Sequence, residues 1–442
     1  MEAEIVVLLM FLGVLIGILL GGPIAFVLAG LAIIFGYWEL GERVFPMFAN
    51  RMWSTATNSL LMAIPMFIFM ASILERSGIA DKLFQSLLYA FGRLNGAIAL
   101  TVVLLSTVFA AVTGVMGATV VSMSLMAIPA MLKYGYDKRL ATGTVAAGGT
   151  IGIIIPPSIM LVIMADQSGE SVGRLFAAGL LPGLLLAGLY FFYILIRCWF
   201  QPAMGPALPK EELDRYSGLQ ITGMILLNMV PPILLIFGVL GSIWFGFATP
   251  TEASAIGAFL ALVLMALYGR FNLKAVGEAT WSTTRTSCMV LAVIVGATLF
   301  TQVFFAVGGR DVVTDLVLIL DDQLGRWGTF AMMMLVVFIL GFLIDWIGII
   351  LIVFPIFLPL GTLLGFNELW LIMMIAVNLQ ASFLTPPVGY ALFYLKGTVP
   401  RGVHMFDIYR GVVPFLLLQL VAIVILAFFP EIITWLPQFV AR

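Results

Sequence analysis

The sequence has few charged side chains. Of its 442 residues only 10% are charged, against about 25% in soluble domains, and 21 basic and 22 acidic residues leave a formal charge of −1. Because nucleic-acid binding depends on a basic excess, this balance excludes a nucleic-acid partner. Hydrophobic residues make up 62% of the chain, which is more apolar surface than a water-soluble fold buries.

Residues and motifs of metal, nucleotide and peptidase sites are also scarce. The chain has two cysteines and one histidine, too few for the usual zinc sites. It lacks the Walker sequence GxxxxGK followed by Ser or Thr, the metallopeptidase sequence HExxH, and the dinucleotide sequence GxGxxG in a strand-turn-helix setting. We therefore expect no enzyme and no bound cofactor, and an energy source other than ATP.

Long apolar runs recur along the whole chain instead. A run of about 20 residues crosses a hydrocarbon core of about 30 Å as a helix, so the sequence predicts an all-α polytopic protein of the lipid bilayer. Ten such crossings lie near residues 5–20, 23–38, 58–76, 138–165, 171–197, 219–242, 252–268, 282–306, 370–395 and 405–429.

Two further apolar stretches, 98–133 and 329–366, are too long for one helix each. The first is interrupted by Thr113-Gly114 and the polar or small residues up to Thr119, and the second by Asp345-Trp346-Ile347-Gly348. Irregular backbone at membrane depth is tolerated where protein covers it. Both stretches are therefore predicted to be re-entrant hairpins.

The basic residues give an orientation. With the N-terminus outside and no net crossing for either hairpin, 15 of the 21 Lys and Arg residues fall on the inner side and 6 on the outer side. Cytoplasmic loops carry such an excess. We expect both termini to be periplasmic and the hydrophilic segment 198–217 to be cytoplasmic.

The sequence repeats weakly when it is shifted by 230 residues. Gly78 then meets Gly308, Pro129 meets Pro359, and the Pro-Pro pair at 156–157 meets that at 386–387. Five crossings separate the two Pro-Pro pairs, so the halves must have opposite orientations. We predict two inverted repeats, residues 1–215 and 216–442, a plan found in many secondary transporters.

Each Pro-Pro pair interrupts a predicted helix and frees backbone carbonyls from it. In broken transporter helices such oxygens coordinate Na⁺, while half-helix N-termini face anionic substrates. The alternative is a pair of kinks whose polar groups are satisfied by neighbouring helices and water. Hydroxyl groups that could supplement the carbonyls are those of Thr113, Thr119, Thr150, Ser158, Ser382 and Thr385.

Asp345 is the one carboxylate that this topology places at membrane depth. An intramembrane ionisable residue is by default a candidate functional residue. Its alternative role is structural, as an acceptor for backbone amides at the hairpin tip. Asn378 and Gln380 lie in the second broken helix, where amides also join helices structurally.

In these features the sequence resembles the large permease (DctM-type) subunit of tripartite ATP-independent periplasmic (TRAP) transporters, within the ion-transporter superfamily. Four motifs carry the resemblance over nearly the whole chain. They are Ala63-Ile64-Pro65-Met66-Phe67, Gly148-Gly149-Thr150 to Ile155-Pro156-Pro157-Ser158, Ala248-Thr249-Pro250-Thr251-Glu252-Ala253, and Asn378 to Thr385-Pro386-Pro387-Val388-Gly389, together with Asp345, Pro355 and Pro359.

The resemblance implies an elevator-type carrier that takes up a small carboxylate, such as a C4-dicarboxylate or 2-oxo acid, with Na⁺ as coupling ion. It implies two partners, a small four-helix membrane subunit and a periplasmic substrate-binding protein, in a bacterial or archaeal inner membrane. The implied Na⁺ ligands are Gly114, Thr119, Gly148, Thr150, Pro156, Asp345, Gly348, Ser382, Thr385 and Pro386, and the implied substrate contacts are Thr113, Ser158, Asn378 and Thr385.

The first hairpin tip departs from the serine-rich tip of many relatives, because it reads Val115-Met116-Gly117. This change favours backbone carbonyls over side chains as ligands there. Two other functions fit the same chain. A Na⁺/carboxylate symporter of the same superfamily would work without a binding protein, and a channel or purely structural subunit would show no saturable Na⁺-coupled uptake.

Overall fold

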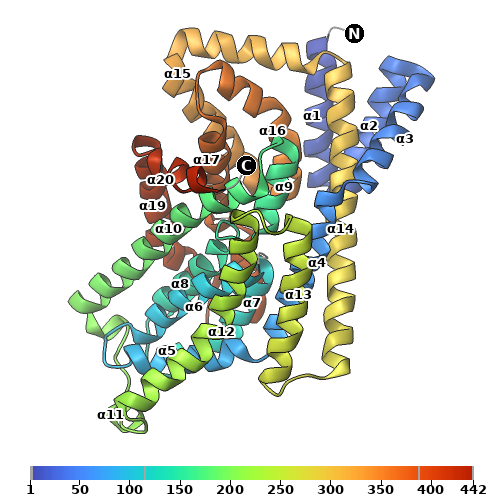
Figure 1. Cartoon of the computed structure of the whole chain (residues 1–442). Helices are drawn as coiled ribbons and strands as arrows, with labels where there is room; N and C mark the ends of the chain where they lie inside the picture. The colour runs from blue at the N-terminus through green and yellow to red at the C-terminus, as the bar shows by residue number, and fades with distance from the viewer. Residues whose placement is uncertain (1–2, 114–115, 387–388, 441–442) are drawn as a thin grey trace.

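The chain folds as a bundle of helices. The computed structural model describes residues 3–113, 116–386 and 389–440, and within these ranges it contains α-helices and short 3-10 helices but no β-strand. The predicted all-α fold class is therefore confirmed. Figure 1 shows the N-terminus at one end of the bundle and α11 (Lys210–Leu213) at the opposite end.

The helices follow one another with short connections. Those of the first half are α1 (Ala3–Leu19), α2 (Ile24–Leu40), α3 (Val44–Ala56), α4 (Ala63–Arg76), α5 (Ile79–Phe91), α6 (Ala97–Thr113), α7 (Met116–Lys133), α8 (Lys138–Ile151), α9 (Ile159–Ser168) and α10 (Val172–Phe200). Those after α11 are α12 (Gly218–Trp244), α13 (Pro250–Leu267), α14 (Leu273–Ala306), α15 (Gly309–Leu343), α16 (Trp346–Leu363), α17 (Glu368–Leu384), α18 (Tyr390–Thr398), α19 (Met405–Phe428) and α20 (Glu431–Thr434).

Ten helical segments in the described ranges are long and apolar enough to cross a membrane. The number equals that of the predicted crossings, but the two sets differ. The ten segments include α7, α15 and α16, which form arms of the predicted hairpins, whereas the apolar helices α1, α9 and α17 are shorter than 18 residues. Short helices are expected where a spanning helix is broken at membrane depth.

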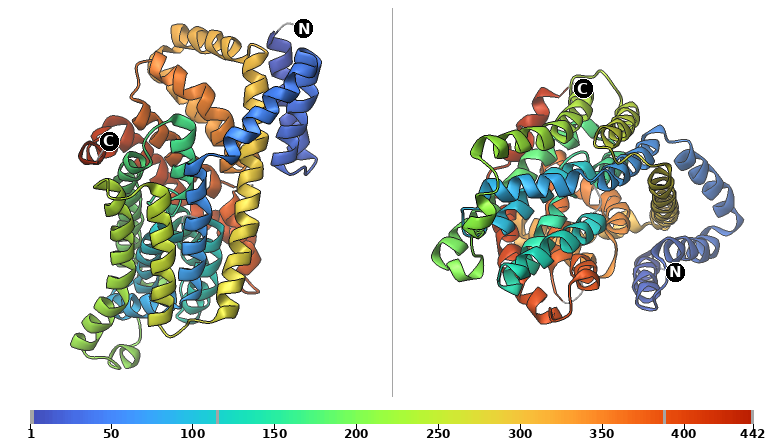
Figure 2. Two further views of the ribbon diagram at one scale, coloured as in Figure 1. Left: turned by 45° about the vertical axis from the view of Figure 1, so that its right-hand side comes forward. Right: turned by 90° about the horizontal axis from the view of Figure 1, so that it is seen from below.

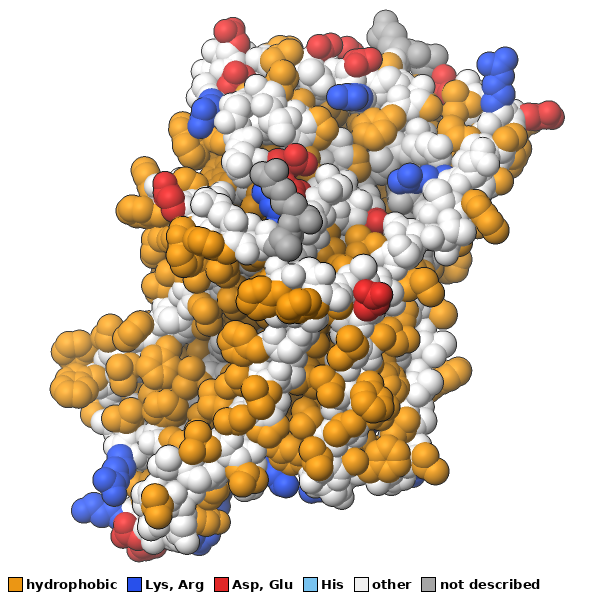
Figure 3. All heavy atoms as spheres, viewed as in Figure 1, with side chains coloured by type: hydrophobic (Ala, Val, Ile, Leu, Met, Phe, Trp, Pro, Cys, Tyr) orange, Lys and Arg blue, Asp and Glu red, His pale blue; other side chains and the backbone are white. Residues whose placement is uncertain are grey.

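The surface of the bundle is apolar. The large side chains of Leu219, Phe247 and Trp199 are 86%, 83% and 75% exposed. Figure 3 shows hydrophobic side chains over much of one face, with charged side chains of both signs toward its upper and lower ends. Such a surface is stable in contact with lipid.

The helix boundaries recur at the predicted offset of 230 residues. Both ends of α7 and α16 differ by this number. Gly78 and Gly308 both adopt the left-handed conformation that favours glycine, and Asp137 and Asn367 both cap the following helix with their side chains. The two halves therefore share one plan. Their division after residue 215 and their opposite orientation in the membrane stay predictions.

Sequence reasoning missed the helices that are only partly apolar. α5 buries Ile79, Leu83 and Leu87 and exposes Asp81, and α3 buries only part of its surface. A search for continuous apolar runs does not detect apolar residues that recur every three or four positions. For the same reason the predicted crossing 282–306 is too short, because α14 begins at Leu273.

α15 bends sharply inside its length. Gly325 has a φ of 69°, so residues 309–324 form one helix and residues 326–343 another. Figure 1 shows the first part lying across the end of the bundle. The second part is the first arm of the hairpin predicted over 329–366, and α16 is its second arm.

The segment between the halves is bound to the base of the first hairpin. The carbonyl of Gly205 accepts a hydrogen bond of 2.7 Å from the amide of Gly96 before α6. The Tyr134 hydroxyl, directly after α7, donates to the Glu212 carboxylate. Burial and this bond raise the pKa of Tyr134 to about 12, so the hydroxyl keeps its proton at neutral pH. The linker therefore holds both arms of this hairpin at their base.

Candidate functional site

Both arms of the first hairpin pack on the end of α8. A Cβ atom on Gly148 would lie 2.9 Å from the Ser106 Oγ of α6, and one on Gly149 would lie 2.4 Å from the Val120 side chain of α7. Glycine is therefore required for this close approach. It brings Thr119, the buried neighbour of Val120, to the first broken helix.

Ser106 is a candidate ligand that the sequence did not single out. Its Oγ is buried and makes no hydrogen bond to any group in the described ranges. Such buried hydroxyls are uncommon. The signal in the sequence is a serine beside Thr107 within a mostly apolar hairpin arm.

Two residues predicted at the tip of this hairpin cannot be placed. Gly114 lies outside the described residues. Thr113 is described only as the last residue of α6, without its side chain. The ligand role of Gly114 and the substrate role of Thr113 stay predictions.

The first predicted break lies between α8 and α9. Among the described groups, no hydrogen-bond donor reaches the carbonyl oxygens of Pro156 and Pro157. The Ser158 hydroxyl donates its proton to the carbonyl of Ile153. The break thus presents two carbonyl oxygens with unused lone pairs, an arrangement that suits a cation better than an anion.

The second hairpin packs on α17 in the same way. A Cβ atom on Gly341 of α15 would lie 2.0 Å from the Ser382 Oγ. Asn378 donates its amide to the carbonyl of Met334 in α15 at 2.6 Å. This bond uses one of the two N–H groups of Nδ2, so the other is left for the substrate contact predicted for Asn378.

The other predicted hydroxyls donate their protons to carbonyls of their own helices. Thr150 donates at 2.8 Å, Ser382 at 2.6 Å and Thr385 at 2.8 Å. An oxygen whose proton is already donated offers only lone pairs to a further partner. These three side chains cannot donate to an anionic substrate in this arrangement, and their roles as cation ligands stay predictions. The Oγ1 of Thr150 also accepts a hydrogen bond of 3.3 Å from the amide of Gln380.

Asp345 begins α16 at the tip of the second hairpin. Its carboxylate accepts a hydrogen bond of 3.4 Å from the amide of Ile347, which is the structural role considered for it. A carboxylate has two oxygens and about four acceptor positions, so capping leaves capacity for a cation. Asp345 also interacts electrostatically with Tyr390 and Tyr394 of α18.

Tyr394 packs on the first hairpin and lies in the field of a carboxylate of the second. A Cβ atom on Gly117, in the first turn of α7, would lie 3.1 Å from its ring, and Asp345 of the other hairpin is within electrostatic range. Sequence reasoning missed this residue. The available signal was a pair of tyrosines, Tyr390 and Tyr394, spaced four apart on one face of the helix that follows the second break.

Gly348 and Pro386 complete the predicted second site. A Cβ atom on Gly348 would lie 2.4 Å from the end of the Ile24 side chain in α2, so this close packing is a second reason for a glycine there. Pro386 is half-buried two residues beyond the end of α17. The roles of both as cation ligands stay predictions.

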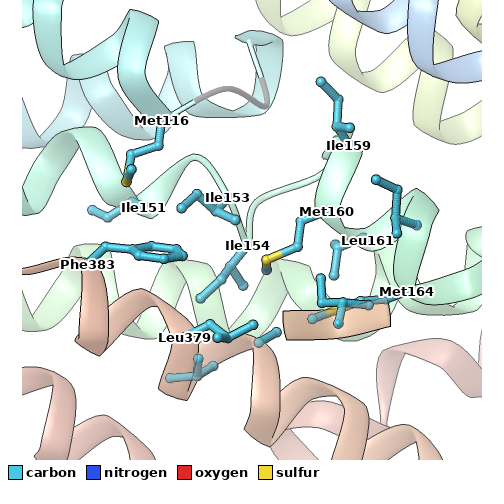
Figure 4. Close-up of a cluster of buried hydrophobic side chains, with 14 of the residues drawn as sticks. Met116, Ile151, Ile153, Ile154, Ile159, Met160, Leu161, Met164, Leu379 and Phe383 are labelled. Atoms are coloured by element: carbon cyan, nitrogen blue, oxygen red, sulfur yellow. The ribbon is translucent and has the colours of Figure 1, made fainter. Parts of the chain in front are cut away.

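The first break packs on α17 in the core of the protein. Figure 4 shows Ile153 and Ile154 of the first break beside Leu379 and Phe383 of α17. These side chains are 2% exposed or less. The candidate site thus lies on a rigid apolar base that both halves contribute.

Comparison with known proteins gives one family and several relatives. Residues 6–432 match the family described as "Tripartite ATP-independent periplasmic transporter, DctM component". The chain is 30% identical over 393 residues to the C4-dicarboxylate TRAP transporter large permease protein DctM of Pseudomonas aeruginosa, which covers 88% of this chain and 89% of that protein. It is 28% identical to the isethionate TRAP transporter permease protein DctMQ of Oleidesulfovibrio alaskensis, over 94% of this chain and 64% of that protein.

The fold is similar to that of a solved transporter structure. The crystal structure of the Alcanivorax borkumensis YdaH transporter, reported to have an unusual topology, matches with a TM-score of 0.64 at 16% identity and covers 96% of this chain and 99% of that one. At this identity the likeness concerns the fold alone.

Proposed function

The chain belongs to the DctM component family of tripartite ATP-independent periplasmic transporters, and from this premise we propose that it couples Na⁺ entry to the uptake of a small organic anion. It is a multi-pass membrane permease, and family members normally work with a small membrane subunit and a periplasmic binding protein. We place it in the inner membrane with both termini on the periplasmic side and segment 198–217 in the cytoplasm.

The proposal of Na⁺ as coupling ion rests on the oxygen atoms around the two breaks. Thr150, Ser382 and Thr385 have donated their protons to backbone carbonyls, and Asp345 adds a carboxylate. In the described ranges no group of three His, Cys, Asp or Glu residues could hold a metal ion. Sites of hydroxyl and carbonyl oxygens with little charge suit a monovalent cation better than a transition metal.

The proposed substrate is a carboxylate, such as a C4-dicarboxylate or a 2-oxo acid. The relatives named above are described as transporters of C4-dicarboxylate and of isethionate, both small organic anions. Bound Na⁺ would attract such an anion to the same place. The alternative function is a Na⁺/carboxylate symporter that needs no binding protein.

The proposed movement is of the elevator type. Each hairpin packs through glycine against its broken helix at Gly148, Gly149 and Gly341, so these elements would travel together as one transport unit. The other helices would form the scaffold. Tyr394 would hold the two hairpin tips in register.

Uptake into proteoliposomes tests the proposed function. The vesicles should contain the large and small subunits, and the binding protein should be added outside. Uptake should stop when Na⁺ is replaced by choline at constant pH and membrane potential, and when the binding protein is left out. Uptake that continues without the binding protein would favour the independent symporter, and unchanged uptake in choline would overturn Na⁺ coupling.

A further inference from the structure

A polar cavity of about 520 Å³ lies between the proposed scaffold and the proposed transport unit. Its walls are α3, α14 and the segment around Asn58 on one side, and α9 and α16 on the other. We propose that this cavity is a loading site, which holds the carboxylate substrate on the periplasmic side before it reaches the hairpin tips. The inference rests on the proposed function and adds a second binding site to it.

Arg51 gives the cavity a cation that can bind an anion. Arg51 and Asp166 are the two ionisable residues in the cavity wall. The carboxylate of Asp166 already accepts hydrogen bonds from the amides of Asn58 and Gln167. The Arg51 guanidinium forms no ion pair within the described residues. A carboxylate entering the cavity would thus find a charged partner that is not already engaged.

Gln302 adds a second polar contact. Its Oε1 is buried in the wall and has no hydrogen-bond partner in the described part of the chain. One turn away, Thr298 and the neighbouring Thr301 donate their protons to the carbonyls of Val295 and Leu351. An acceptor left without a donor costs about 1–3 kcal/mol, and water or a hydroxyl group of the substrate would satisfy it.

The repeat supplies an independent argument, because a related cavity lies in the other half. This smaller cavity, about 80 Å³, is lined by Ile68, Ala71, Ser72 and Glu75. Shifted by 230 residues, these positions are 298, 301, 302 and 305, all of which line the larger cavity. In inverted repeats such positions lie on opposite sides of the membrane. Alternating access would then open the cavity on one side while the cavity on the other side is closed.

The two cavities differ in charge. The larger one contains the cation Arg51, whereas the smaller one contains Glu75, whose carboxylate accepts a 2.7 Å hydrogen bond from Ser122 of α7. An anion is attracted by the first group and repelled by the second. Asp166 places a carboxylate beside Arg51 in the larger cavity, so the difference between the two cavities is the cation. The larger cavity has one to hold an incoming anion, and the lining of the smaller one does not, which suits release of the substrate after opening.

Thiol protection tests the loading site directly. Cys198 and Cys288 are first replaced by alanine, and Ser54→Cys then places a reporter in the cavity wall. The purified complex of large and small subunits in nanodiscs is labelled with a maleimide in the presence of succinate, malate or pyruvate, each without the binding protein and without Na⁺. At least one of these anions should slow labelling, and Arg51→Gln should weaken that protection about tenfold, as expected for one charge-assisted hydrogen bond.

Two variants serve as controls. Arg51→Lys should restore most of the protection because it keeps the charge, and Arg43→Gln, at an exposed position outside the cavity, should leave it unchanged. No protection by any of the three anions, or equal protection in Arg51→Gln, would overturn the loading site. Protection that depends on Arg51 in a protein that shows no Na⁺-coupled uptake would uphold the loading site and overturn the proposed function instead.

Discussion

Gln380 donates a hydrogen bond of 3.3 Å from its Nε2 to the Oγ1 of Thr150, and the two residues are 230 positions apart. This number is the repeat offset, so each residue touches the equivalent position of the other half. Positions related by a two-fold axis can meet only near that axis. The ends of α8 and α17 therefore meet near the axis that would relate the two predicted inverted repeats, beside both broken helices.

Removing this bond should weaken the contact between the halves. The Oε1 of Gln380 is buried without a hydrogen-bond partner in the described part of the chain, so Gln380→Leu removes that cost together with the bond. The bond is therefore measured by the coupling between Gln380→Leu and Thr150→Val, which we expect to be about 1 kcal/mol in the free energy of unfolding. Thr150→Val should change the free energy of unfolding by less in the Gln380→Leu background than in the wild type. Thermal unfolding of the four proteins in detergent measures this coupling, and strictly additive losses would show that the bond contributes nothing.

Asp345→Asn should raise the Na⁺ concentration that gives half-maximal uptake by about tenfold, since an intramembrane carboxylate is retained when it binds a cation. Asparagine also caps helices, so this variant removes the charge and keeps the capping of α16. Asp315→Asn, on an exposed part of α15, is the matched control. An unchanged Na⁺ response in Asp345→Asn would leave Asp345 with its capping role alone.

A cross-link between a hairpin and the scaffold should stop transport. Ser122 of α7 donates to Glu75 of α4 at 2.7 Å, so Ser122→Cys with Glu75→Cys places two thiols within reach of a short linker. Uptake should fall to background when the link forms and return when it is reduced. Thr251 donates to the carbonyl of Ser59 at 2.9 Å, and a link between cysteines at these two scaffold positions should have no effect. Full uptake with the hairpin linked would exclude the elevator movement.

The packing of α8 on α19 should tolerate no additional methyl group. A Cβ atom on Gly143 would lie 2.1 Å from the carbonyl oxygen of Gly411. Gly143→Ala should therefore destabilise the protein by about 1–3 kcal/mol, the usual cost of overpacking. Gly188→Ala, where nothing lies within 4 Å, should be neutral or slightly stabilising. Melting temperatures of both variants check the prediction, and equal values would contradict it.

The fold was predictable wherever one local signal decided the structure. Apolar runs located most helices, and Asp137 and Asn367 begin their helices as caps. The sequence Thr249-Pro250-Thr251-Glu252 forms a capping box, which is a local pattern of four residues. The amphipathic helices α3 and α5 escaped detection because their apolar residues are not consecutive.

The candidate site was only partly predictable. The Pro-Pro pair at 156–157 marks its break because proline acts on its own backbone. Tyr394, Ser106 and Arg51 matter through neighbours that are distant in sequence, and a single sequence does not contain that information. Gly148 also depends on a distant neighbour, because its close approach to Ser106 already explains the glycine. The sequence predicted it as a cation ligand.

Reciprocal coupling is the most direct test of Na⁺-driven uptake. If the two fluxes are coupled, a gradient of substrate alone must move Na⁺. Proteoliposomes with equal Na⁺ on both sides and the substrate-loaded binding protein outside should accumulate radiolabelled Na⁺ as the substrate enters, and Asp345→Asn should reduce that accumulation. Entry of the substrate without any movement of Na⁺ would contradict the account.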